Sequence, residues 1–195
     1  AAIHRHAGGP IDMEDTWKPL FVVASDFSSG NEQVLATGPL EQSVGASYAI
    51  PGALPPVLRD GHLLFDGSVF NNLPVGVMAE QGVGTIIAVD LSDDTPHHLD
   101  LTTLPSPLEL LRDRLRPSSH QRYRGVPTLP ETLLLSAFLT STARQRTERH
   151  QADLLIHPPL EDTGLLNWHS FDEMVEAGYR HAAKVLATAS PSPER

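Results

Sequence analysis

The carboxylate of Asp66 is the side chain whose position in the sequence best suits a role in catalysis or binding. Asp66 follows a short apolar run, His62-Leu63-Leu64-Phe65, which stops abruptly at Asp66-Gly67-Ser68. Such a run, bounded by turn residues, predicts a buried strand. Asp66 would then lie where the strand ends, and ligand crevices in α/β proteins open at the carboxyl ends of strands. Gly67 places a flexible backbone next to that carboxylate.

The residues that follow add amide groups and the start of a helix. Asn71 and Asn72 precede Leu73-Pro74, and a proline can open a helix at its first position. The two amides could orient Asp66 or its loop, but loop asparagines as commonly bond to their own backbone. Taken alone, an Asp-Gly pair after a short apolar run is more often a turn than a site.

Three elements are expected upstream of this stretch. Residues 20–25 form a continuous apolar run, which is typical of a strand buried on both faces. Ser28-Ser29-Gly30-Asn31 has turn chemistry, so residues 33–37 are expected to form a second strand, hairpinned to the first. Pro39 opens a helix that runs to Ala49.

Helix and strand alternate after Asn72. A helix over residues 74–81 precedes residues 85–91, a β-branched apolar run that predicts a strand. This order is the second half of a crossover, so we expect an α/β fold with a mostly parallel central sheet. Asp90, at the end of that strand, is expected as a polar cap rather than as a group that faces a crevice.

Three helices and one strand complete the chain. Residues 107–116 predict a short amphipathic helix, and residues 128–149 a long one. The long helix carries Arg144, Arg146 and Arg149 near its end, where cations suit the helix dipole. Residues 152–157 predict a strand. The last helix begins after Ser170, and its apolar stripe is expected to be buried: Phe171, Met174, Val175, Tyr179, Ala182, Val185 and Leu186.

Composition excludes several classes of function. The chain has 195 residues with 14 basic and 24 acidic side chains, and its net charge of −10 opposes binding to nucleic acid. It has no cysteine, so disulfides and thiolate metal sites are excluded. The histidine pairs His4/His6 and His97/His98 have spacings that do not make a metal site. We therefore expect no metal and no cofactor.

Several blocks of the sequence together resemble a known family. They are IDMEDTWKPLFVVASDFSSG, SYAIPGALPPV, DGHLLFDGSVFNNLPVGVMAEQG, IIAVDL and GLLNWHSFDEMVEAGYRHA. These blocks resemble the second half of a patatin-like phospholipase domain, in the neuropathy-target-esterase branch and its bacterial relatives. The resemblance implies a three-layer α/β sandwich with a mostly parallel central sheet, here incomplete at its N-terminal side.

The same resemblance implies a lipid-ester hydrolase with a two-residue site. In that family a serine in G-x-S-x-G attacks the ester, and the aspartate of a D-G-G or D-G-A motif is its partner. The matching aspartate is Asp66, with Ser68 where the family usually has glycine or alanine. Gly67, Asn71 and Asn72 would support it. No histidine and no cofactor is required.

The nucleophile motif itself is absent, because no G-x-S-x-G occurs in the 195 residues. We therefore expect residues 1–189 to be the C-terminal portion of a single catalytic domain, inactive alone, followed by a disordered tail at 190–195. A Ser-Asp-His triad with His157 or His169 as base is a rival scheme. The other alternative is a non-catalytic α/β module that binds lipid or contributes only structure.

The expected partners follow from these interpretations. The substrate would be a phospholipid or lysophospholipid, with peripheral contact to a membrane and no binding of nucleic acid. No run of about 18 apolar residues occurs, so no spanning helix is expected and the chain is expected in the cytoplasm, at most peripheral to the inner membrane. An incomplete sheet would expose an edge, which the missing N-terminal half or a second copy would cover.

Overall fold

The computed structural model describes residues 9–92, 101, 103–117, 120, 122–123, 126–127, 129–159 and 171–189. The expectations for His4, His6, His97, His98, His169, Ser170 and the tail at 190–195 lie outside these ranges. Within them, no helix combines the length and the apolar character that crossing a bilayer requires. The chain divides into two compact units, residues 1–93 with 137–195 and residues 94–136.

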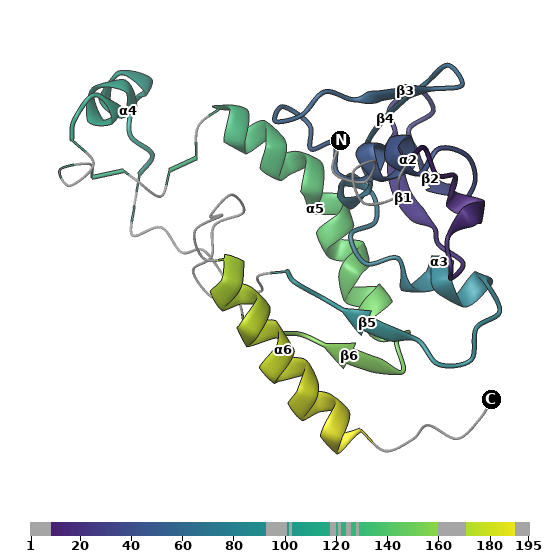
Figure 1. Cartoon of the computed structure of the whole chain (residues 1–195). Helices are drawn as coiled ribbons and strands as arrows, with labels where there is room; N and C mark the ends of the chain where they lie inside the picture. Colours follow the sequence, from purple (N-terminus) through teal and green to yellow (C-terminus); the bar gives the residue numbers. More distant parts are fainter. Residues whose placement is uncertain are drawn as a thin grey trace. The chain divides into compact units, whose positions relative to one another are not determined.

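The first unit is built on a four-stranded sheet in the order β2-β1-β4-β3 (Figure 1). Its strands are β1 (Val22–Asp26), β2 (Asn31–Leu35), β3 (Val57–Arg59) and β4 (His62–Asp66). All three pairings are antiparallel, with Val22 opposite Leu35 and Ala24 opposite Asp66. The predicted strand before Asp66 and the predicted hairpin at residues 20–37 are confirmed.

Tight turns explain why neighbouring strands run in opposite directions. Gly30, with φ of 72°, ends the β1–β2 turn. Asp60 and Gly61 join β3 to β4 with φ of 51° and 81°. Positive φ at both central residues matches the twist of a two-residue hairpin, and aspartate followed by glycine suits those positions.

A small apolar core lies between the sheet and the helix α2 (Leu40–Ser47). Ala24, Leu35, Ala46 and Leu64 form it, each buried and each from a different element. Full burial of a leucine side chain such as Leu64 contributes about 1.5–3 kcal/mol. This core therefore fixes the face of β4 on which residues 62, 64 and 66 lie.

The mostly parallel central sheet expected from the sequence is corrected by the structure. Among the described strands, only β5 (Ile87–Val89) and β6 (Leu154–Ile156) are parallel, and they form a separate two-stranded sheet. The helix α3 (Val75–Glu80) leads from β4 toward β5 without returning the chain to the first sheet. Leu73, Val75, Ile86 and Ala88 pack together beneath the pair. The described chain is thus mixed α/β, with antiparallel strands dominant.

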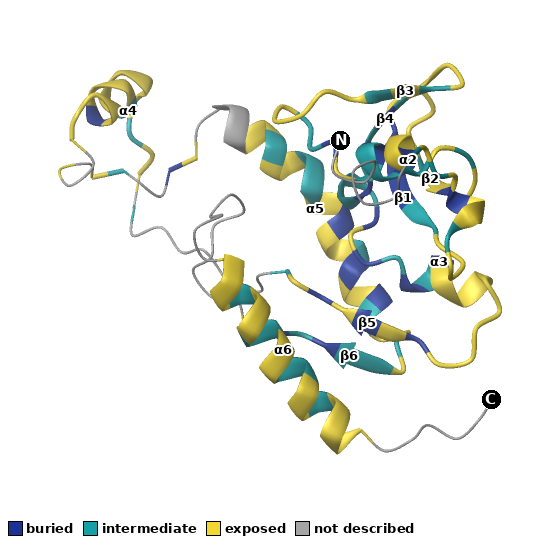
Figure 2. Cartoon of the chain, viewed as in Figure 1, coloured by how far each residue is buried: buried dark blue, intermediate teal, exposed yellow. Residues whose placement is uncertain are grey.

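Two long helices occur in the second half of the chain, one before β6 and one after it. α5 spans Leu129–Arg149, and its residues from 137 onward belong to the first unit. The last helix, α6 (Phe171–Thr188), has no buried residue, which corrects the expected buried stripe (Figure 2). Met174, Ala182 and Val185 are half-buried, but Phe171, Val175, Tyr179 and Leu186 are at least half exposed. The short β5–β6 pair offers too little surface to cover the whole stripe.

The second unit contains the helix α4 (Pro107–Arg114), which begins with a capping box between Ser106 and Glu109. Its one buried side chain, Asp113, accepts hydrogen bonds from the backbone N–H groups of Arg122 and Tyr123 at 2.9–3.1 Å. Burial raises the pKa of the Asp113 carboxyl, but these two bonds together with the charge and hydrogen bond of Arg116 outweigh it, so the pKa lies below its usual value. A carboxylate therefore fastens the following loop to α4.

A similar carboxylate holds the β1–β2 turn against β4. Asp26 is 3% exposed and accepts hydrogen bonds from Ser28 N at 2.8 Å and Ser29 Oγ at 2.6 Å. His62 Nδ1 lies 2.7 Å from Asp26 Oδ2. The bond from Ser29 is the main cause that lowers the Asp26 pKa to about 2, against burial, with His62 and Ser28 adding to it.

This lowered pKa predicts a loss of stability in acid. An unfolded aspartate titrates near 3.8, so the stabilisation by Asp26 is complete above that pH and is lost as the pH falls through about 2. We expect the urea midpoint of Asp26→Asn to depend less on pH than that of the wild type between about pH 4 and pH 2. The exposed Asp60→Asn is the control and should follow the wild type. Parallel curves for wild type and Asp26→Asn would contradict this account.

Candidate functional site

Asp66 is the last residue of β4 and is half-buried. Its backbone N–H donates to the Ala49 carbonyl oxygen at 3.0 Å, and its Oδ1 accepts from Ser68 N at 2.8 Å. The side chain thereby caps the short 3-10 helix η2 (Gly67–Val69). In the described part of the chain, the second oxygen, Oδ2, accepts no hydrogen bond. One oxygen is therefore held in place and the other is available.

Gly67 is required by a close approach of two backbone segments. A Cβ atom at this position would lie 2.2 Å from the Val23 carbonyl oxygen and 2.7 Å from the Val23 carbonyl carbon. Gly67 is also buried. The contact presses the turn after Asp66 against β1, so the direction of the carboxylate is set by the sheet.

The two asparagines lie differently from each other. Asn71 is 3% exposed, its backbone N–H donates to the Gly67 carbonyl oxygen at 2.8 Å, and its Nδ2 donates to Glu32 Oε2 at 2.9 Å. Asn72 is exposed, and its Nδ2 lies 3.5 Å from Gln145 Oε1. Asn71 thus fastens the loop to β2, whereas Asn72 reaches α5. Among the described contacts, neither amide bonds to Asp66.

An ion-pair group on α5 contacts the same loop and was missed at the sequence level. The Arg144 guanidinium donates to both oxygens of Glu32 at 3.1 Å, and its Nε donates to Glu148 Oε1 at 3.1 Å. Glu148 Oε2 accepts from Gly76 N at 2.6 Å. Burial lowers the pKa of Arg144, but the bonds to the two carboxylates outweigh it and raise the pKa. The i, i+4 spacing of Arg144 and Glu148 was the only local signal.

A second polar group closes the carboxyl end of β5. Asp90 is 1% exposed and accepts from Gln145 Nε2 at 2.6 Å, from Ser92 N at 2.9 Å and from Arg149 Nε. His157 Nδ1 lies 3.0 Å from the Asp90 carbonyl oxygen. The interpretation of Asp90 as a polar cap fits this burial. His157 lies at the end of β6, in a different sheet from Asp66.

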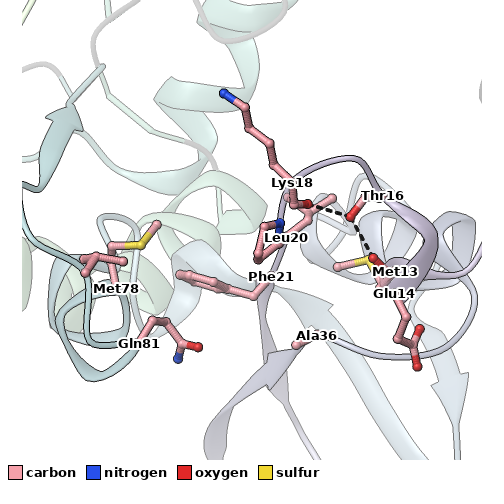
Figure 3. A pocket seen from close by; sticks show the side chains of 11 residues that line it. Met13, Glu14, Thr16, Lys18, Leu20, Phe21, Ala36, Met78 and Gln81 are labelled. Carbon is pink, nitrogen blue, oxygen red and sulfur yellow. Dashed lines mark hydrogen bonds between the residues drawn. The ribbon is translucent and has the colours of Figure 1, made fainter.

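A hollow of about 680 Å³ lies at the end of the sheet where β1 begins and β2 ends (Figure 3). Phe21 and Ala36 line it directly beyond the Val22–Leu35 pair, Met78 lines it from α3, and Gln81 lines it just after that helix. The remaining lining is Met13, Glu14, Thr16, Lys18, Pro19, Leu20 and Val83. β4 is antiparallel to β1, so it runs toward this end of the sheet, but Asp66 pairs with Ala24, two residues inside Val22, and does not line the hollow. The lining is mainly apolar, with Glu14, Thr16, Lys18 and Gln81 as its polar residues.

No metal centre accompanies these groups in the described residues, because their His, Asp and Glu side chains form no cluster of three that could hold an ion. The described groups thus offer one oriented carboxylate, Asp66, and a mainly apolar hollow that is lined by other residues of the same unit.

Comparison with known proteins agrees with the motifs. Residues 5–79 match the family described as patatin-like phospholipase. The chain is 34% identical over 180 residues to the neuropathy target esterase sws of Drosophila melanogaster, covering 88% of this chain and 12% of that protein. It is 31% identical over 182 residues to the lysophospholipase NTE1 of Pyricularia oryzae, covering 91% of this chain and 12% of that protein.

A bacterial relative is similar to the same degree. An uncharacterized NTE family protein of Mycobacterium tuberculosis is 33% identical over 182 residues, which cover 92% of this chain and 30% of that protein. The resemblance to patatin-like phospholipases is therefore confirmed. Within them, the chain is similar over most of its length to the neuropathy-target-esterase branch. The chain spans between about an eighth and a third of the length of these relatives.

The close approach at Gly67 predicts a large effect of a single methyl group. We expect Gly67→Ala to lower the free energy of unfolding by about 3 kcal/mol, the upper end for overpacking, because the obstacle is backbone that cannot rotate away. Urea unfolding followed by circular dichroism measures it. Gly84→Ala is the matched control, since a Cβ there meets nothing within 4 Å. Equal stability of both variants would show that β1 and the turn are not pressed together.

Proposed function

We propose that this chain supplies the acidic half of a Ser-Asp pair in a hydrolase of lipid acyl esters. The observation that carries the proposal is the state of Asp66, with one oxygen held by Ser68 N and the other available, inside a stretch that resembles the family's aspartate motif. The nucleophile would be the serine of a G-x-S-x-G motif, which does not occur in these 195 residues. The chain alone would then be inactive.

In this mechanism Asp66 moves protons. It takes the proton of the serine hydroxyl while the serine Oγ bonds to the ester carbonyl carbon, and it gives that proton to the departing alcohol. Water then attacks the acyl-serine, Asp66 accepts the water's proton, and the serine oxygen leaves with a proton returned from Asp66. Oxyanion donors, typically about 3 kcal/mol each, would come from outside this chain.

The substrate class follows from the relatives and the hollow. Lysophospholipase and esterase are the activities that the relatives' names state. The apolar lining around Phe21 and Met78 suits an acyl chain, because burial of each CH₂ contributes about 0.8 kcal/mol.

We also propose that the N-terminal half of the domain, or a second copy, covers Ile87 and Val89 of β5, which are 53% and 54% exposed. Contact with a membrane would be peripheral.

The acid's role is tested by Asp66→Asn in the full-length gene product. We expect the rate of p-nitrophenyl ester hydrolysis to fall by about 10²–10⁴-fold, the usual contribution of a positioned base. Asp60→Asn, on the adjoining hairpin and exposed, is the control and should retain activity. Full activity of Asp66→Asn would refute the pair. Hydrolysis by the isolated 195 residues, abolished by Asp66→Asn, would instead place the hydroxyl within this chain.

The rival triad is separated by a second pair of changes. Replacement of His157 and His169 by alanine would cost a triad enzyme several orders of magnitude in rate. A Ser-Asp pair needs neither imidazole, so we expect kcat to fall by far less than the roughly 10²–10⁴-fold that loss of a positioned base costs.

A second candidate function is a non-catalytic module that binds lipid, and the missing serine motif favours it. Both candidates predict that the hollow takes an acyl chain. We expect Phe21→Asp to weaken binding of a fluorescent fatty acid by about tenfold or more, because one charge replaces the apolar wall. Leu58→Asp, 71% exposed on β3, is the control. Unchanged binding by Phe21→Asp would exclude the hollow as the lipid site.

A further inference from the structure

Two segments distant in sequence meet at Glu32. Its two carboxylate oxygens accept hydrogen bonds from Nη1 and Nη2 of Arg144, both at 3.1 Å, and Oε2 also accepts from Asn71 Nδ2 at 2.9 Å. Such a two-pronged arrangement fixes orientation as well as distance, which a single lysine cannot reproduce. Glu32 thus joins β2, α5 and the loop after Asp66 at one point.

From this point the connection runs to Asp66 in two steps. The Asn71 side chain is held by Glu32, and its backbone N–H donates to the carbonyl oxygen of Gly67, the neighbour of Asp66. Asn71 is 3% exposed, so water competes little for these bonds. A displacement of Asn71 therefore moves the Gly67–Ser68 peptide, whose N–H donates to the Asp66 carboxylate.

The other end of the loop is held by the same arginine. Arg144 Nε bonds to Glu148, and Glu148 bonds to the N–H of Gly76 at 2.6 Å, in the first turn of α3. A Cβ at position 76 would lie 3.2–3.4 Å from the Glu148 carboxylate oxygens, so the helix start and α5 are in close contact. Residues 67–76 are thus held at both ends.

The charges explain why the arginine is needed. Glu32 and Glu148 are two carboxylates that face one cation, and Arg144 separates them. Loss of the cation would leave two like charges close together, which repel each other. The Asn71 amide and the Gly76 N–H would then be the only described donors left to the two carboxylates.

We propose that Arg144 is a positioning residue for Asp66, acting through Glu32 on Asn71 and through Glu148 on Gly76. The proposal rests on the proposed function of Asp66, and it assigns to α5 a role beyond packing. Arg144 touches neither Asp66 nor, in this account, the substrate. It stabilises the loop whose Ser68 N–H donates to the carboxylate.

The test uses Arg144→Met and Arg144→Lys, with Arg146→Met as the matched control. Arg146 lies two residues further along the same helix and is exposed. Its replacement by methionine removes the same charge but leaves the bonds from Arg144 to Glu32 and Glu148 in place. Hydrogen exchange of the purified chain, followed by NMR, reports on the Asn71 and Gly76 amides. We expect both to exchange at least tenfold faster in the two Arg144 variants, with the Ala88 amide in β5 unchanged. The Arg146 variant should match the wild type.

The second readout is the kinetics of ester hydrolysis by the full-length gene product. A misplaced carboxylate impairs the chemical step, so we expect kcat to fall by about 10- to 100-fold with KM within about twofold of the wild type. Glu32→Gln should lower kcat similarly, and Glu32→Gln with Arg144→Met should cost little more than either change alone, because the two share one contact.

The outcomes are separable. Uniformly faster exchange, including at Ala88, would mean a general loss of stability and would overturn the proposal. Unchanged kcat in both Arg144 variants, in an enzyme that Asp66→Asn inactivates, would overturn it too. If Asp66→Asn leaves hydrolysis intact, the proposed function fails, and local exchange at Asn71 and Gly76 still shows whether Arg144 holds the loop.

Discussion

The contact between Gly67 and the backbone of Val23 is the constraint on which the rest of the site depends. β4 leaves the sheet at Asp66, and the chain can turn there only because no side chain separates it from β1. The same turn lets Ser68 N donate to the Asp66 carboxylate. The glycine of the Asp-Gly pair is therefore determined by packing rather than by an unusual φ angle, and the aspartate inherits its orientation from the sheet.

Around this contact, hydrogen bonds between polar groups hold the loop in place, a role that apolar packing usually has. The cluster between the sheet and α2 is small, and in the loop after Asp66 the buried apolar side chains, Leu73 and Val75, lie at its far end. Its place is set by buried or half-buried hydrogen bonds to Glu32, Glu148 and Gln145. Bonds of this kind are directional, so they specify one loop conformation better than contacts between methyl groups do.

Local patterns predicted the elements well, because hairpins and helix starts depend on neighbouring residues. The apolar run at residues 62–65 and the turn at residues 28–31 sit where expected. The prediction of a mostly parallel sheet was wrong, since strand direction depends on which strands pair. Two tight turns made β1–β2 and β3–β4 antiparallel, and β1 and β4, which α2 and β3 separate in sequence, pair antiparallel as well. The partners of Asn71 could not be foreseen either, because Arg144 lies 112 residues from Glu32. The burial of α6 was overestimated because periodicity shows which face of a helix is apolar but not how much of the neighbouring protein covers that face.

That separation in sequence has a consequence for the order of folding. All four strands of the main sheet come from residues 22–66; two of the three pairings are hairpins with short loops, and the third, between β1 and β4, also lies within this stretch, so the entropy of closing these loops is modest. On a ribosome, which works from the N-terminus, this sheet can be complete before α5 has been synthesised. The bonds from Arg144 to Glu32 and from Gly76 to Glu148 can form only when residues 144–148 are present, so the loop after Asp66 gains its last contacts after the sheet that precedes it.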